Sequence, residues 1–202
     1  TLFRSDLANI LGNLVNRTIA MTNKYFDGIV TNPGVNEPVD DELKEIALAM
    51  PQKVQDLMDE YKASKALDEI FVLLRRTNKY IDDTMPWALA KEEDKKDRLA
   101  TVLYNLIEAI RFAAIALEPY MPSTSTKILD QINTDQREFK DLTTFGLYKV
   151  GTKVTDKPQQ LFARLDPKEV EKKVEALQPK KEEPKEEENQ ITIDDFTKVE
   201  LV

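Results

Sequence analysis

The chain has 202 residues, of which 29 are Lys or Arg and 37 are Asp or Glu, so its formal net charge is −8, and it contains neither Cys nor His. Without Cys there is no disulfide framework, thiolate nucleophile or zinc ribbon, and without His there is no Ser-His-Asp triad and no His-type metal site. We therefore expect no catalytic residue and no metal site for acyl transfer, metalloprotease or dehydrogenase chemistry.

The first predicted element is an amphipathic helix over residues 6–26, because apolar side chains recur there at steps of three and four. Gly28 can take the left-handed conformation just past its end. A second helix is expected to begin at Asp40 and Asp41, whose charges suit a helix N-terminus. Pro51 should bend or interrupt this second helix.

A third helix is expected to begin at Ser64 and to end near Thr84, because Pro86 disfavours the helical conformation in the residue before it. The clearest apolar stripe follows, over residues 99–117. A short further helix is predicted for residues 123–132.

These helices predict an all-α fold, an antiparallel helical bundle over residues 1–135. From Thr144 the pattern changes, which indicates a short extended or β appendix packed on the bundle, residues 136–165. A charged helix, a disordered charged linker and the truncated start of a further domain are expected for residues 166–177, 178–190 and 191–202. Since the chain begins with Thr1, we interpret it as a fragment of a longer protein.

Two features of the sequence bear on localisation. No uninterrupted apolar run approaches the ~20 residues of a membrane span. The first residues also lack the basic and apolar pattern of a secretory signal. We therefore expect a cytoplasmic protein with no membrane partner.

Polar side chains recur on one face of the first predicted helix. Asn9, Asn13 and Arg17 follow one another at steps of four, so they share a face beside the apolar stripe. Asn offers a donor and an acceptor, and Arg a rigid fork of donors with a flat stacking surface. Such a row can bind base edges and phosphates, or it can be an ordinary solvated helix face.

The only tryptophan, Trp87, follows Pro86 where the third helix ends, outside the apolar stripes. It can belong to the core, or it can be a platform for an unstacked base, a contact worth ~1–3 kcal/mol. Arg75, Arg76 and Lys79 precede it by one to three turns. They are candidate phosphate contacts, with a solvated face as the alternative.

Several segments, in this order along the chain, resemble the anticodon-binding domain of bacterial methionyl-tRNA synthetases. They are residues 11–17 (LGNLVNR), 78–87 (NKYIDDTMPW), 99–104 (LATVLY) and 119–122 (PYMP). Residues 161–166 (LFARLD) resemble the segment that closes the domain, although Ala163 stands where the family commonly has Pro. Residues 191–202 (ITIDDFTKVELV) resemble the first strand of the OB-fold tRNA-binding module appended to many of these enzymes.

The resemblance implies that the bundle binds the CAU anticodon loop of tRNA(Met). It assigns anticodon contacts to Asn13, Arg17 and Trp87, with Pro86 shaping the turn and Asn9 one turn earlier. It implies no cofactor in this chain, because ATP and Mg²⁺ belong to the catalytic domain of the parent methionine–tRNA ligase, whose His-Ile-Gly-His motif is absent here. The parent is expected to be a homodimer through the C-terminal domain that is truncated here.

Two alternatives stay open. An acidic helical protein–protein interaction module fits the charge and the lack of catalytic groups, because nucleic-acid binders are expected to be basic. The anticodon domain of another class I synthetase would share the fold. The first alternative gives Trp87, Asn13 and Arg17 no common purpose, and we predict that these three lie on one surface, close enough to contact the same nucleotide.

Overall fold

The computed structural model describes residues 3–162 and Val174, with side chains described from Asp6 onward. Six α-helices lie within residues 3–162: α1 (Asn13–Phe26), α2 (Pro38–Asp59), α3 (Ala63–Thr84), α4 (Pro86–Leu89), α5 (Lys96–Ala116) and α6 (Pro122–Ile132). A π-helix, η1 (Phe3–Gly12), precedes α1, and two 3-10 helices, η2 (Glu93–Lys95) and η3 (Phe139–Thr143), complete the described helical elements. The chain divides into two compact units, residues 1–163 and 164–202. The segments predicted for residues 166–202 lie outside the described part, apart from Val174.

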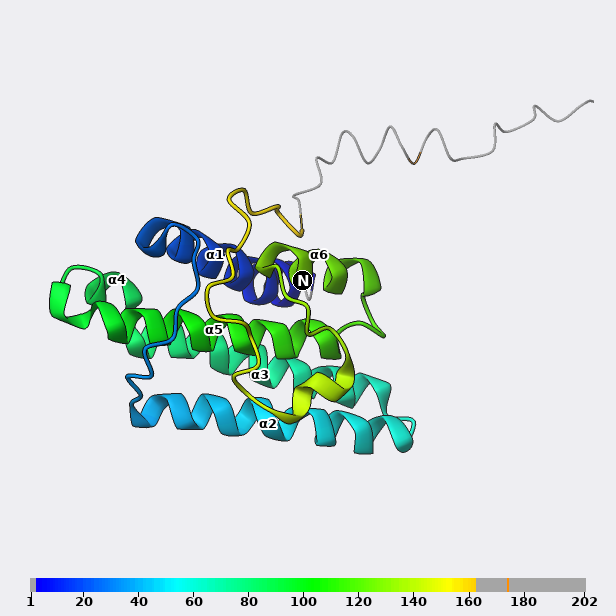
Figure 1. Ribbon diagram of the computed structural model, residues 1–202. Helices are drawn as coiled ribbons and strands as arrows, with labels where there is room; N and C mark the ends of the chain where they lie inside the picture. The colour runs from blue at the N-terminus through cyan, green and yellow to red at the C-terminus, as the bar shows by residue number, and fades with distance from the viewer. Residues whose placement is uncertain (1–2, 163–173, 175–202) are drawn as a thin grey trace, which may run out of the picture. The chain divides into compact units, whose positions relative to one another are not determined.

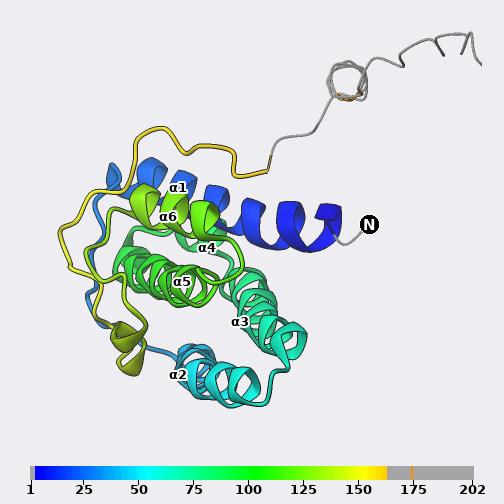
Figure 2. The ribbon, with the colours of Figure 1, turned by 90° about the vertical axis from the view of Figure 1, so that its right-hand side faces the viewer.

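Helix α5 is the central element of the first unit. Helices α1, α2, α3, α4 and α6 all contact it, and Figures 1 and 2 show α1 and α6 on one side of it and α2 on the other. Its residues from Arg98 to Ala116 are all buried, as expected for a helix that is apolar on every side. By length and composition Glu93–Ala116 could also cross a membrane, but its apolar stretch is entirely buried inside the bundle. The predicted all-α bundle is confirmed.

Several helix ends follow the predicted signals, but the helix predicted over residues 6–26 is divided into η1 and α1, and α3 begins at Ala63, with Lys62 rather than Ser64 at its N-cap. The second helix differs in two ways. Gly28 has a φ of 81°, the predicted left-handed conformation. Helix α2 begins at Pro38 rather than at Asp40, because Glu37 and Asp40 form a capping box around its first turn. Helix α2 also continues through Pro51 without interruption, since buried apolar side chains on both sides of the proline hold it against the bundle.

The predicted extended appendix contains the 3-10 helix η3, and after it residues 144–162 cross the bundle as an irregular strap. It makes one antiparallel bridge, between Ile29 and Lys153, to the loop that follows α1. Beside this bridge the Val30 N–H donates to the Thr152 carbonyl at 2.9 Å, and the Gly151 N–H donates to the Val30 carbonyl at 2.8 Å. The backbone of the strap, yellow in Figure 1, therefore pairs with the loop after α1 over only a few residues.

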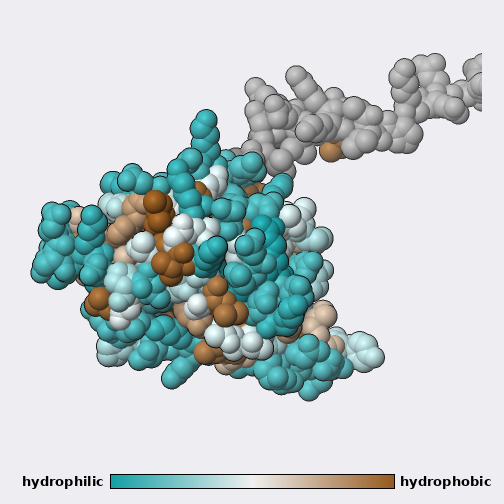
Figure 3. Space-filling view, viewed as in Figure 1, coloured by the Kyte–Doolittle hydropathy of each residue, from teal (hydrophilic) through white to brown (hydrophobic). Residues whose placement is uncertain are grey.

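The face of the bundle seen in Figure 3 is largely hydrophilic, with separate apolar patches. Three aromatic residues are exposed in the described part: Tyr61 is 96% exposed, Phe139, in η3, is 43% exposed, and Trp87 is 42% exposed. Tyr61 lies in the turn before α3 and Trp87 lies just after its end. These two aromatic side chains are therefore at opposite ends of a helix of 22 residues, about 30 Å apart along its axis.

Three buried tyrosines, Tyr80, Tyr104 and Tyr148, are expected to make the fold sensitive to alkali. Burial raises the pKa of each phenol, that of Tyr104 to about 12. Because phenols of the unfolded chain ionise near pH ~10, the stability that these groups contribute is complete below that pH and declines as the pH rises above it. In an ultraviolet titration, part of the six tyrosines should ionise only as the helical circular dichroism is lost. Ionisation of all of them with the helical signal intact would contradict this expectation.

Candidate functional site

Helix α1 presents an exposed polar face. Asn13 and Arg17 are both exposed, four residues apart on this helix. Lys24, also exposed, follows Arg17 by seven residues, which is two helical turns and therefore the same face. Within residues 3–162, no hydrogen bond or ion pair engages the side chains of Asn13 or Arg17. Their amide and guanidinium groups are available to a ligand.

Asn9 is exposed as well, but it lies in the π-helix η1. A π-helix has i→i+5 hydrogen bonds, so the four-residue spacing of α1 does not continue unchanged across Gly12. At Gly12 a Cβ atom would lie 3.2 Å from the Phe162 ring and 3.3 Å from the Leu7 carbonyl oxygen. The ring of Phe162 therefore packs closely against the junction between η1 and α1. Asn9 lies in the π-helix and Asn13 in the α-helix, so the two belong to helices of different geometry.

Trp87 lies on the short helix α4, which is formed by a sharp change of chain direction. Met85, with a φ of 42°, ends α3 and precedes α4. The buried Pro86 takes the first position of α4, where its missing N–H costs nothing. The Ala88 N–H donates to the Met85 carbonyl at 2.8 Å and closes the turn. The indole, 42% exposed, is therefore held at the rim of the bundle and is not sealed in the core.

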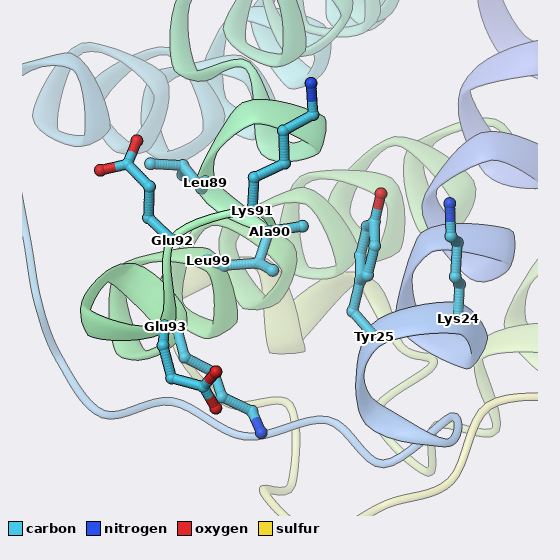
Figure 4. Close-up of a pocket in the computed structure, with 9 residues that line it drawn as sticks. Lys24, Tyr25, Leu89, Ala90, Lys91, Glu92, Glu93 and Leu99 are labelled. Carbon is cyan, nitrogen blue, oxygen red and sulfur yellow. The ribbon is translucent and has the colours of Figure 1, made fainter.

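A pocket of about 230 Å³ lies between the end of α1 and the chain that follows α4. Its lining residues are Lys24, Tyr25, Leu89, Ala90, Lys91, Glu92, Glu93, Lys96 and Leu99. The Lys24 Nζ is 5.2 Å from the centroid of the Tyr25 ring, a cation–π distance. In Figure 4 the side chains of Lys24, Tyr25 and Lys91 point to the same side, that of Glu92 points to this side as well, and that of Glu93 points to the opposite side. This side of the pocket therefore carries two lysines, an aromatic ring and one carboxylate, and Lys95 pairs with that carboxylate at 2.6 Å.

The pocket is lined by residues near the two places that the sequence singled out, although Asn13, Arg17 and Trp87 themselves do not line it. Lys24 lies on the α1 face two turns beyond Arg17, and Leu89 comes two residues after Trp87. That Asn13, Arg17 and Trp87 contact the same nucleotide stays a prediction. Sequence reasoning missed Lys24 and Lys91. The seven-residue spacing from Arg17 was a usable signal for Lys24, but only the fold brings Lys91 to the same pocket.

The three basic residues of the predicted cluster on α3 lie in different environments. Arg76 is only 7% exposed, and its guanidinium pairs with Glu42 at 2.9 Å and with Asp83 at 3.3 Å. Its hydrogen bond and charge lower the pKa of the Glu42 carboxyl. The structure therefore argues against Arg76 as a phosphate contact, because two carboxylates already engage it. Arg75 and Lys79 are exposed one turn apart, and their contact with phosphate stays a prediction.

An all-α bundle with an exposed indole on its rim and unengaged amide and guanidinium groups on the adjoining helix has the architecture of a helical binding domain. A family model described as the anticodon binding domain of methionyl tRNA ligase matches residues 31–182. The chain belongs to this family. The matched range includes Trp87 and begins after α1.

Individual relatives extend the similarity over the rest of the chain. The methionine–tRNA ligase of Caldanaerobacter subterraneus subsp. tengcongensis is 47% identical over 207 residues, covering 98% of this chain and 31% of the relative. That of Clostridium tetani is 48% identical over 205 residues, with the same coverage of 98% and 31%. The chain thus spans about a third of the length of the curated relatives that it matches.

Solved structures agree with this assignment. The apo form of Mycobacterium tuberculosis methionyl-tRNA synthetase superposes with a TM-score of 0.77 at 35% sequence identity, covering 83% of this chain and 34% of that one. The same synthetase bound by methionyl-adenylate gives a TM-score of 0.75 at 34% identity, covering 80% and 32%. The bundle therefore has the fold of the corresponding third of these enzymes.

Proposed function

We propose that this chain binds the CAU anticodon loop of tRNA(Met) as one part of a longer methionine–tRNA ligase. The observation that carries the proposal is the half-exposed indole of Trp87 on a short turn next to the pocket that reaches α1, in a bundle that belongs to the anticodon-binding family. Single-stranded RNA loops are recognised by stacking unpaired bases on aromatic rings and by hydrogen bonds to their edges. The rim offers both kinds of group.

Each group at the rim has a distinct role in this proposal. The indole of Trp87 stacks on one unpaired base. The guanidinium of Arg17 donates to ring and carbonyl acceptors of the cytosine, and the amide of Asn13 accepts from its amino group or donates to its neighbour. Lys24 and Lys91, whose side chains point to one side of the pocket, neutralise phosphates of the loop backbone.

The net charge of −8 is compatible with RNA binding, because its distribution is uneven. Residues 166–202 contain 7 basic and 12 acidic residues, so 7 − 12 = −5 of the total lies outside the bundle. Beside the rim the side chains of Lys24 and Lys91 point to the same side of the pocket, where Lys95 neutralises the nearby Glu92 carboxylate. The isolated chain should nevertheless bind RNA weakly, because few of its charges can pair with phosphates.

The chemistry of aminoacylation lies elsewhere in this proposal. A catalytic domain in the same longer chain would bind ATP and Mg²⁺ and attach methionine to tRNA(Met). This chain would bind and orient the anticodon loop. Its further partner would be a second copy of the enzyme, through a C-terminal domain of which residues 191–202 are the beginning. The cytoplasm, where tRNA is charged, is the expected compartment.

The single tryptophan makes the proposal directly testable. Titration of the 202-residue chain with a CAU stem–loop should quench the emission of Trp87, because the stacked base contacts the indole. A loop with the first anticodon base changed should bind at least about tenfold more weakly, the effect of losing ~1.4 kcal/mol of base-edge contacts. Lys53→Ala, which removes a positive charge from α2 on the other side of α5 (Figure 2), is the matched control and should change neither affinity.

The two alternatives give different results. Equal quenching by both loops would leave stacking without sequence recognition and would remove Asn13 and Arg17 from the proposed site. Absence of quenching by either loop, at RNA concentrations that saturate the complete enzyme, would contradict the proposal and favour a protein-binding module.

A further inference from the structure

A buried carboxylate joins three helices behind the rim. Asp40, in the first turn of α2, has no exposed surface. Its Oδ1 accepts a hydrogen bond from the Tyr80 hydroxyl at 2.7 Å and another from Arg98 at 2.8 Å. Its Oδ2 accepts a second bond from Arg98 at 2.7 Å. The carboxylate therefore links α2 to α3 through Tyr80 and to α5 through Arg98.

These two partners lie on either side of the segment that carries the indole. Tyr80 is near the end of α3, and Arg98 is the third residue of α5. Residues 81–97 between them include Trp87 and the turn that lines the pocket. Helix α4 has only four residues, too few to be stable by itself, so its position depends on its packing against α5 and on how the ends of this segment are held. Asp40 holds both ends.

The network around this carboxylate is complete. The Glu37 N–H donates to Asp40 Oδ2 at 3.0 Å, and the Asn105 amide donates to the Tyr80 hydroxyl at 3.2 Å. Burial by itself would raise the pKa of Asp40, but the hydrogen bonds from Arg98 and Tyr80 outweigh it and hold the pKa below the ordinary value. The carboxylate is therefore ionised at neutral pH. The desolvation of a buried ion pair offsets most of the attraction between its charges. The main effect of this network is therefore to fix the positions of α2, α3 and α5 relative to one another.

We propose that Asp40 is a positioning residue of the anticodon-loop site: by holding the end of α3 and the start of α5 together, it sets where the Trp87 indole is presented. This inference rests on the proposed function for its effect on RNA binding. Its effect on the indole itself can be measured without RNA.

The test replaces Asp40 with Asn in the 202-residue chain. The amide has one acceptor oxygen in place of two, so it cannot satisfy Tyr80 and both Arg98 nitrogens. Because Trp87 is the only tryptophan, its emission, anisotropy and quenching by acrylamide report the rim alone. Asp40→Asn should increase acrylamide quenching, lower the anisotropy and weaken binding of the CAU stem–loop about tenfold, through loss of stacking. It should also reduce the preference for CAU over the loop with the changed first base.

Glu108→Gln is the matched control. Glu108 forms a second buried ion pair of α5, with Arg111, and Arg111 donates to the carbonyls of Asp141 in η3 and Thr144 just after it, whereas Asp40 and Arg98 hold the segment that carries Trp87. This variant should lose stability in urea unfolding while the Trp87 emission and the affinity for CAU stay at wild-type values. If both variants change the Trp87 signals equally at matched stability, the effect is general loosening and the positioning role is wrong.

A second variant keeps the inference testable if Asp40→Asn fails to fold, as judged by its helical circular dichroism. Tyr80→Phe removes only the link to α3 and leaves the Arg98 pair, so a smaller change of the same sign in quenching is expected. An unchanged Trp87 signal in folded Tyr80→Phe, with Asp40→Asn unfolded or unchanged, would overturn the inference. If the wild-type chain does not bind the loop, the proposed function fails, whereas the change in Trp87 emission still decides the positioning role.

Discussion

Replacing Glu108 with Ala should lower the free energy of unfolding by about 3–5 kcal/mol, the usual cost of leaving a buried charge without its partner. Glu108 and Arg111 have no exposed surface. Arg111 donates to Glu108 Oε2 from two nitrogens, at 2.7 and 3.0 Å. Glu108 Oε1 also accepts the backbone N–H of Tyr148. The substitution would leave the buried Arg111 guanidinium without its counter-charge and the Tyr148 N–H without its acceptor.

Urea unfolding followed by circular dichroism measures this loss. Glu69→Ala removes a carboxylate of the same type from an exposed pair, 3.5 Å from Lys53, and should cost less than about 1 kcal/mol. Similar losses in the two variants would mean that the buried pair contributes no more than an ordinary surface pair. Detachment of η3 and the strap from the bundle without global unfolding would appear as early proteolysis between residues 139 and 154.

Trp87→Ala should weaken binding of the CAU stem–loop by ~1–3 kcal/mol, roughly 5- to 150-fold, because the stacking surface for one base is lost. Trp87→Phe should restore part of the affinity, since it keeps an aromatic face of smaller area. Binding is measured with a labelled RNA, since the variants lack the intrinsic probe. Tyr61→Ala is the matched control: its ring is 96% exposed but lies at the other end of α3, and its loss should leave the affinity unchanged.

A phosphate contact behaves differently from a base contact. Lys91→Ala should weaken CAU and changed loops by the same factor and should lower the salt dependence of binding by about 0.7 in log–log slope, the contribution of one phosphate of a single strand. Trp87→Ala should leave that slope unchanged. If Trp87→Ala leaves the affinity unchanged, or if Tyr61→Ala lowers the affinity by the same factor as Trp87→Ala, stacking at the rim is not the source of binding.

The local pattern of the sequence was sufficient for the fold. Apolar spacing predicted each of the long helices, and Gly28 and Pro86 marked helix boundaries that the structure confirms. These signals act over a few residues, because helix periodicity and backbone restrictions depend on near neighbours. The same kind of signal singled out Asn13 and Arg17, four residues apart on a helix, and Trp87 outside every apolar stripe. Their exposure in the structure agrees with that reading.

The sequence alone did not predict which residues far apart in the chain form hydrogen bonds and ion pairs with one another. Asp40 was interpreted as a helix start, and only the fold shows that it is buried against Tyr80 and Arg98, which lie 40 and 58 residues away. Arg76 was a candidate for phosphate until the structure paired it with Glu42, 34 residues away. Residue type, charge and spacing can be read from the chain alone. Burial and ion pairing depend on which helix faces meet around α5, and the packing of the whole bundle determines which faces meet.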